Sequence, residues 1–127
     1  MTAHVPKIGK TTLRRLGIIE SFGGACEVCG AIGNDRLQVA HLVARSELPR
    51  GKPHPLRWSP MNLAVLCIPC HEAFDIAVGV SAWWHERRSS GKTKSRRARF
   101  KEFEEKFKVL LRMRRVGLAQ LAAMRAK

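Results

Sequence analysis

The first regular pattern of apolar residues lies near the N-terminus. Over residues 11–22, apolar side chains recur every three residues, at Leu13, Leu16, Ile19 and Phe22. This spacing places them on one face of a helix, and such a face packs against a protein core. Gly23 and Gly24 follow directly and end the pattern. The sequence therefore predicts an α-helix over about residues 11–22, with these four side chains in the core.

Two short apolar runs come next, separated by a long interruption. Residues 37–43 alternate in apolar character and residues 61–66 are mostly apolar, so both predict short strands. The segment 44–60 between them carries Gly51 and four prolines, which predicts a long irregular loop. A helix over residues 69–78 follows the second strand, with proline in its first turn. The order strand, loop, strand, helix predicts a ββα unit.

The C-terminal third has a longer helical pattern. From Arg96 on, an apolar stripe predicts packing on the core or on a second subunit, at Phe100, Phe103, Phe107, Leu110 and Leu111. Gly117 predicts a break in this helix. The fold class is therefore α+β. Residues 1–85 would form the ββα core behind its N-terminal helix, and residues 86–127 a long basic helical extension.

Positive charge is concentrated in that extension. The chain of 127 residues has a net charge of +14, and residues 86–127 contribute +11 of it, from fifteen Lys and Arg against four Glu. Such an excess predicts binding to the phosphate backbone of nucleic acid, because each neutralised phosphate releases counterions. The alternative is a merely solvated helix face. A membrane surface is disfavoured because residues 87–99 contain few apolar anchors.

The four cysteines of the chain stand in two Cys-x-x-Cys pairs, Cys26 with Cys29 and Cys67 with Cys70. This spacing predicts one zinc ion held by four thiolates. A closed four-sulfur site is structural, because no coordination position stays open for chemistry. Two disulfides or free thiols are the alternative, disfavoured because the N-terminus shows no export signal. The sequence also contains no apolar run long enough for a membrane span, so we expect a cytoplasmic protein.

Polar residues suited to hydrolysis lie inside the frame set by the cysteines. His41 ends the first predicted strand, Asn62 opens the second, and His71 begins the helix. Asp75 follows His71 by four residues, so the two share one helix face and can chelate a divalent ion. Taken one at a time, His41 is also typical of a strand end and Asn62 of a turn. His71 alone could belong to the edge of the zinc site, and Asp75 alone to an ion pair. In this order within the cysteine frame, they predict an active site.

The run from Cys26 to Asp75 resembles the HNH nucleases, also called ββα-metal nucleases. The matching pieces are the CEVCG turn, the strand end VAHLVAR, the second strand SPMNLAVLC and the helix start CIPCHEAFD. They cover about two-fifths of the chain. The residues that give the family its name would be His41, Asn62 and His71. One departure is Ala40, because many members carry Asp, Glu or His at that position as a ligand of the catalytic metal.

The resemblance implies a small ββα-metal core with zinc knuckles and the activity of a metal-dependent DNA endonuclease, which hydrolyses phosphodiester bonds by nicking or double-strand cleavage. His41 would be the general base that activates water, and Asn62 would hold the backbone and ring of His41. His71 and Asp75 would bind the catalytic ion, for which Mg²⁺, Mn²⁺, Ni²⁺ and Zn²⁺ all suit the ligands. Small chains of this type occur in phages, mobile elements and restriction systems, so the expected setting is a bacterial or phage-infected cell.

We expect DNA to be bound mainly through its phosphate backbone, since no group of residues indicates base recognition. The predicted contacts are the basic residues of the loop and of the extension, Arg45, Arg50, Lys52, Arg57, Arg87, Arg88, Lys92, Lys94, Arg96, Arg97 and Arg99. A catalytically inactive, zinc-containing nucleic-acid-binding module is the alternative function, and Ala40 favours it. The C-terminal helix is also a candidate surface for a homodimer or a larger assembly.

Overall fold

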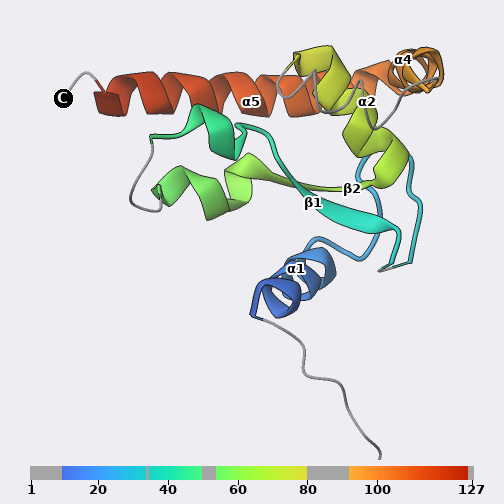
Figure 1. The fold of residues 1–127 in the computed structure, drawn as a ribbon, viewed down its shortest axis with the longest axis horizontal. Helices are drawn as coiled ribbons and strands as arrows, with labels where there is room; N and C mark the ends of the chain where they lie inside the picture. Colours follow the sequence, from blue (N-terminus) through green and yellow to red (C-terminus); the bar gives the residue numbers. More distant parts are fainter. Residues whose placement is uncertain (1–9, 34, 50–53, 80–91, 126–127) are drawn as a thin grey trace, which may run out of the picture.

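A computed structural model describes residues 10–33, 35–49, 54–79 and 92–125. The described residues form a small α+β fold with a two-stranded antiparallel sheet, which confirms the predicted class. In Figure 1 this sheet lies between helix α1 on one side and helix α5 on the other. No helix within the described ranges is long and apolar enough to cross a membrane.

The sheet consists of β1 (Leu37–His41) and β2 (Leu63–Cys67). The register pairs Leu37 with Cys67 at one end and His41 with Leu63 at the other. At the usual rise of a strand, the two ends are about 13 Å apart. Any site built on Cys67 and any site built on His41 therefore occupy opposite ends of the sheet.

Both strands differ slightly in extent from the predicted runs 37–43 and 61–66. β1 ends at His41 because the next residues, Leu42 and Val43, donate their backbone N–H groups to Asn62 instead of to a strand partner. The segment before β2 is a short 3₁₀ helix, η3 (Pro60–Asn62), whose first position suits proline.

The loop predicted over 44–60 is more ordered than its prolines suggest. In its described parts it contains, besides η3, two further 3₁₀ turns, η1 (Arg45–Glu47) and η2 (Pro55–Trp58). His54 caps η2, because its Nδ1 accepts a hydrogen bond from the backbone N–H of Leu56 at 3.1 Å. Each turn places side chains at a defined angle, which an irregular loop would not.

The N-terminal helix α1 (Lys10–Ser21) matches its prediction in extent but only partly in packing. Ile19 is buried, and Ile18 and Phe22 pack beside it, whereas Leu13 is 54% exposed. The expectation that Leu13 lies in the core is therefore wrong. Only the C-terminal half of α1 contributes to that core, so the apolar face of its first turn stays in solvent.

The helix after β2, α2 (Ile68–Val78), begins and ends close to its predicted limits. Gly79 ends it in a left-handed conformation with φ of +81°, which glycine adopts without strain, and its N–H donates to the carbonyl of Asp75. The order β1, β2, α2 agrees with the predicted succession of elements.

The C-terminal part forms two helices, α4 (Thr93–Glu102) and α5 (Glu104–Arg125). The chain turns at Phe103, and α5 runs without interruption through Gly117. The predicted break at Gly117 is therefore wrong. A Cβ atom at this position would lie 2.9 Å from Cγ2 of Val43, so the glycine instead permits α5 to approach the segment after β1 closely.

The apolar stripe of the C-terminal helices packs on the core. The sequence predicted packing either there or on a second subunit. Phe107 and Leu110 are buried in the same hydrophobic cluster as Leu37 and Phe74. Burying one side chain such as Phe107 stabilises the fold by about 1.5–3 kcal/mol. Residues 92–125 thus share a core with the ββα unit, while the predicted boundary between residues 85 and 86 lies outside the described residues.

Candidate metal centre and active site

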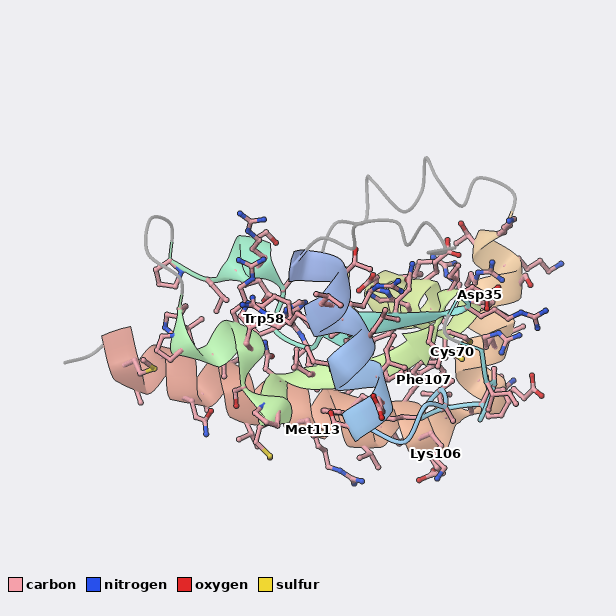
Figure 2. The ribbon with its side chains drawn as sticks, turned by 90° about the horizontal axis from the view of Figure 1, so that it is seen from below. Asp35, Trp58, Cys70, Lys106, Phe107 and Met113 are labelled. Carbon is pink, nitrogen blue, oxygen red and sulfur yellow. The ribbon has the colours of Figure 1, made fainter. Side chains whose placement is uncertain are left out.

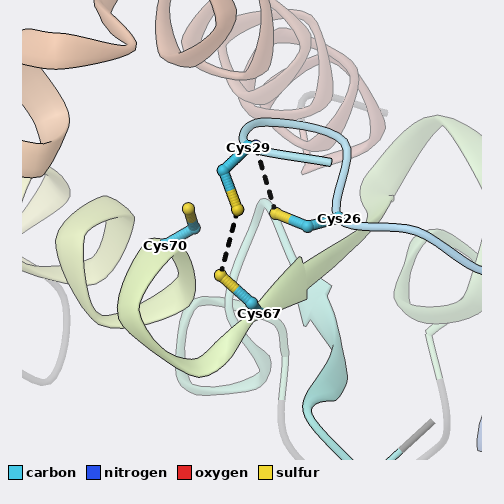
Figure 3. A group of neighbouring side chains, drawn as sticks. All are labelled: Cys26, Cys29, Cys67 and Cys70. Atoms are coloured by element: carbon cyan, nitrogen blue, oxygen red, sulfur yellow. Dashed lines mark hydrogen bonds between the residues drawn. The ribbon is translucent and has the colours of Figure 1, made fainter. Parts of the chain in front are cut away.

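Four cysteine side chains converge at one end of the sheet (Figure 3). Cys26 and Cys29 come from the turn after α1, Cys67 ends β2, and Cys70 lies in the first turn of α2. Their sulfur atoms all lie within 4.8 Å of one another. Sulfurs on a tetrahedral zinc ion are about 3.8 Å apart, given zinc–sulfur bonds of about 2.3 Å. The cluster therefore fits a zinc ion, and the four cysteines are free of disulfides.

The first cysteine pair is held by hydrogen bonds within its turn and to the sheet. Gly30 has φ of +81° and donates its N–H to the carbonyl of Cys26, which closes the turn. The N–H of Cys29 points at the sulfur of Cys26, 3.5 Å away. Glu27 exchanges two hydrogen bonds with the backbone of Val65 in β2, of 2.9 and 2.6 Å. The turn is thereby fastened to the strand that carries the third cysteine.

The close approach of the sulfurs changes their affinity for protons. A hydrogen bond between the thiol groups of Cys26 and Cys70 lowers the pKa of Cys26 and raises the pKa of Cys70. Burial raises the pKa of Cys67. Four adjacent thiolates repel one another unless a cation lies among them, and a zinc ion supplies that charge. The donor set is thus chemically suited to zinc as well as geometrically.

Helix α4 lies over α2 and brings two arginines to this end of the molecule. Arg99 Nη1 lies 3.7 Å from the sulfur of Cys70, and Arg96 pairs with Glu72 at 3.3 Å. These two residues, predicted as DNA contacts, are engaged inside the protein. Among the other predicted contacts, Arg57 is half-buried, whereas exposed side chains belong to Arg45, Lys92, Lys94 and Arg97. Arg50, Lys52, Arg87 and Arg88 lie outside the described residues.

At the opposite end of the sheet, Asn62 joins the two chain segments that flank the loop. It is the only polar residue among the buried side chains of the described ranges, with 1% exposure. Its Oδ1 accepts the backbone N–H of Val43 at 2.7 Å, and its Nδ2 donates to the carbonyl of Val43 at 3.2 Å. Its own carbonyl accepts the N–H of Leu42. Asn62 therefore fixes the backbone that directly follows His41.

Helix α5 supports the same segment from its other side. Arg114 donates one hydrogen bond to the carbonyl of Leu42 at 2.9 Å and pairs with both carboxylate oxygens of Glu47 in η1. Glu47 in turn accepts the backbone N–H of Ala44 at 2.9 Å. Bidentate pairs of this kind are directional, so they restrict the position of the chain after β1.

His41 itself is half-buried and packs edge-on against Trp58, with ring centroids 5.0 Å apart. Its Nε2 is buried and has no hydrogen-bond partner within the described part of the chain. Burial, together with the positive charge of Arg57, lowers the pKa of His41 from its ordinary value of 6.5. The ring is therefore neutral at neutral pH, which is the state that a general base needs.

His71 and Asp75 lie together on α2, as their spacing predicts. Nε2 of His71 is 3.3 Å from Oδ2 of Asp75, and Nδ1 of His71 is 2.7 Å from Oε1 of Gln38 in β1. Since Oε1 is an acceptor, Nδ1 donates this hydrogen bond, and Nε2 is the ring nitrogen that faces Asp75. Burial, aided by the charge of Glu72, raises the pKa of Asp75 to about 7.

No hydrogen bond or ion pair joins His41 to His71 or Asp75 within the described residues. Along β1, His41 lies three residues beyond Gln38, about 10 Å at the rise of a strand. Side chains alternate along a strand, so Gln38 and Ala40 share the face toward α2 and His41 belongs to the other face. The four cysteines are the only group of three or more metal-ligating side chains that converges in the described ranges.

Several residues of this region carry no signal in the sequence. Gln38 at His71 and Arg114 at Leu42 are examples. So are Trp58 beside His41 and Arg14 beside Trp58. Each contact joins segments that are distant along the chain, so neither spacing nor periodicity could have indicated it.

Comparisons with models of known protein families, with curated proteins and with solved structures find no significant match. The likeness to HNH nucleases therefore rests on the motif residues of this chain. The chain is a small α+β protein in which four cysteines form a cluster suited to a structural zinc ion.

Proposed function

We propose that the protein is a metal-dependent DNA endonuclease of the HNH type that hydrolyses phosphodiester bonds, with His41 as general base. The observation that carries the proposal is the contact between His71 and Asp75. With Nδ1 hydrogen-bonded to Gln38, His71 directs Nε2 at a carboxyl oxygen of Asp75 3.3 Å away. An imidazole nitrogen and a carboxyl oxygen that face each other in this way can hold a divalent ion between them.

His71 and Asp75 would hold the divalent ion, which would stabilise charge on the scissile phosphate and the leaving oxygen. Gln38 keeps the ring of His71 in the tautomer and orientation that a ligand requires. Because the chain offers two ligands here, with Ala40 in place of a third, water and substrate oxygens would complete the shell, as is common for Mg²⁺.

His41 would remove the proton from the attacking water. Its Nε2 is buried, which leaves Nδ1 as the nitrogen for this transfer. The lowered pKa keeps the ring ready to accept a proton at neutral pH, and Asn62 holds the backbone on which the ring stands. The partner would be DNA, bound through its phosphates by exposed residues such as Arg45, Lys92 and Arg97.

Cleavage of supercoiled plasmid by the zinc-loaded protein tests the proposal, with Mg²⁺, Mn²⁺, Ni²⁺ and Zn²⁺ added in turn. His41→Ala should lower the rate by about 10²- to 10⁴-fold, the usual contribution of a general base. Lys106→Gln, a change on the exposed face of α5, is the control and should cut like the wild type. The acid limb of the rate against pH should lie below the ordinary histidine pKa. A wild type that cuts no faster than His41→Ala with any ion would refute the proposal.

A catalytically inactive nucleic-acid-binding module is the second candidate. The observation that favours it is the lack of a second convergent group of three ligands in the described residues, with a buried alanine at position 40. It predicts DNA binding that is indifferent to His41→Ala and to His71→Ala. It also predicts no Mn²⁺ site besides the zinc, whereas the nuclease predicts a Mn²⁺ site that His71→Ala or Gln38→Leu weakens.

A further inference from the structure

Trp58 stands at the centre of a cluster of positively charged side chains beside His41. The guanidinium carbon of Arg14 lies 4.7 Å from the centre of the Trp58 ring, and that of Arg57 lies 5.3 Å from it. The ring of His41 meets Trp58 edge-on at 5.0 Å. Arg14 comes from α1, Arg57 and Trp58 from η2, and His41 from the end of β1. Figure 2 shows Trp58 close to α1 and far along the sheet from Cys70.

Neither arginine of this cluster has an acidic partner among the described residues. Arg96 pairs with Glu72 and Arg114 with Glu47, but no carboxylate of the described residues pairs with Arg14 or Arg57. The Nε atom of Arg57 is buried and has no hydrogen-bond partner there either. Positive charge with unused donors next to a half-buried histidine is the arrangement that an anionic ligand would complete.

The two guanidinium groups are also held near the same ring. Since both lie near a single ring, their central carbons are at most about 10 Å apart, by the two distances to its centre. Stacking on an indole holds a guanidinium in place while leaving its donors available, which favours recognition of a planar or tetrahedral oxyanion. The indole thus acts as a platform that orders both arginines before a ligand arrives.

We propose that Arg14, Arg57 and Trp58 form a phosphate clamp that seats a phosphodiester group of the DNA strand against His41. The proposal rests on the proposed function and names a substrate contact of that site. Arg14 and Trp58 are new in this role. Because Arg14 belongs to α1, the site would be incomplete without the N-terminal helix, although α1 lies outside the ββα unit.

The test measures binding of a fluorescent DNA duplex to zinc-loaded protein, without added divalent ion, over a series of salt concentrations. Arg14→Gln and Arg57→Gln should each weaken binding about tenfold at low salt, the loss expected for one charge-assisted hydrogen bond. Each should also reduce the slope of log affinity against log salt by about 0.9, since one phosphate contact is lost. At equal ionic strength, inorganic phosphate should displace DNA from the wild type more strongly than chloride does. From both variants, phosphate and chloride should displace DNA equally.

Lys106→Gln removes one positive charge from the first turn of α5, away from Trp58, and is the matched control (Figure 2). Arg14→Lys and Arg57→Lys retain the charge without the planar fork, so they should keep the salt slope but lose affinity. The lysine variants also serve if a glutamine variant does not fold. Unchanged affinity and slope in both arginine positions, or an equal loss in Lys106→Gln, would overturn the clamp.

The outcomes also separate the clamp from the nuclease. Weaker binding by Arg14→Gln and Arg57→Gln, in a protein that cuts no DNA, would uphold the clamp and overturn only the nuclease. Cleavage that depends on His41, with binding unaffected by either arginine, would uphold the nuclease and overturn only the clamp.

Discussion

Gly117 lies where α5 packs against the segment after His41, and its replacement by alanine measures how firmly that contact is packed. The added Cβ would lie 2.9 Å from Cγ2 of Val43, a fully buried and stiff β-branched side chain. Inserting a methyl group into such a site costs about 1–3 kcal/mol. Alanine also favours a helix over glycine by about 1 kcal/mol. The net change for Gly117→Ala should therefore be a loss of about 0–2 kcal/mol in the free energy of unfolding.

Gly17 provides the matched control, because it also lies inside a helix but has nothing within 4 Å of an added Cβ. Gly17→Ala should stabilise the protein by about 1 kcal/mol through helix propensity alone. The difference between the two variants, about 1–3 kcal/mol, is then the steric cost at Val43. Urea denaturation of the zinc-loaded protein measures both values. In thermal melts the variants should differ by about 4–12 °C, at roughly 4 °C per kcal/mol for a chain of this size.

A single result would refute this reasoning. If Gly117→Ala stabilises the protein as much as Gly17→Ala does, then α5 is not packed against the segment that holds Val43. The support that α5 lends to the backbone after His41 would then have to be abandoned as well.

Three further predictions concern the site. Asn62→Ala leaves the N–H and carbonyl of Val43 unpaired in the core and should cost about 2–4 kcal/mol in urea denaturation, whereas Ser46→Ala on the exposed η1 turn should change stability by less than about 0.5 kcal/mol. Cys67→Ser should lower the zinc content measured by mass spectrometry and the Tm, and a variant that keeps both would contradict a four-thiolate site. Burial raises the pKa of Asp75 from 3.8 to about 7, so the folded state holds a proton that the unfolded chain releases. The free energy of unfolding should therefore fall as pH rises from about 4 to about 7, by less than about 1.4 kcal/mol per unit, and Asp75→Asn should abolish that part of the fall.

Local features of the sequence were sufficient for the first two helices, for both strands and for the metal centre. Helices α1 and α2 and both strands follow from apolar spacings of two to four residues. These spacings depend on backbone geometry alone. The two Cys-x-x-Cys pairs specify a zinc site through ligand chemistry, and the structure brings all four sulfurs together. His71 and Asp75 meet because residues four apart share a helix face. The prediction for Leu13 failed because periodicity gives the apolar face of a helix but not how much of it the sheet covers.

Tertiary structure alone decided what surrounds these residues. Gln38 contacts His71, 33 residues away, and Asn62 binds Val43, 19 residues away. No local pattern could therefore predict either contact. Packing also turned Arg99 of the predicted DNA-binding stretch toward the sulfur of Cys70. Charge and periodicity are properties of single segments. Which side chains contact each other depends on the close packing of segments that are remote in sequence. The chain thus determined which side chains are suited to bind metal and phosphate, and the fold determined which of them have neighbours that make this possible.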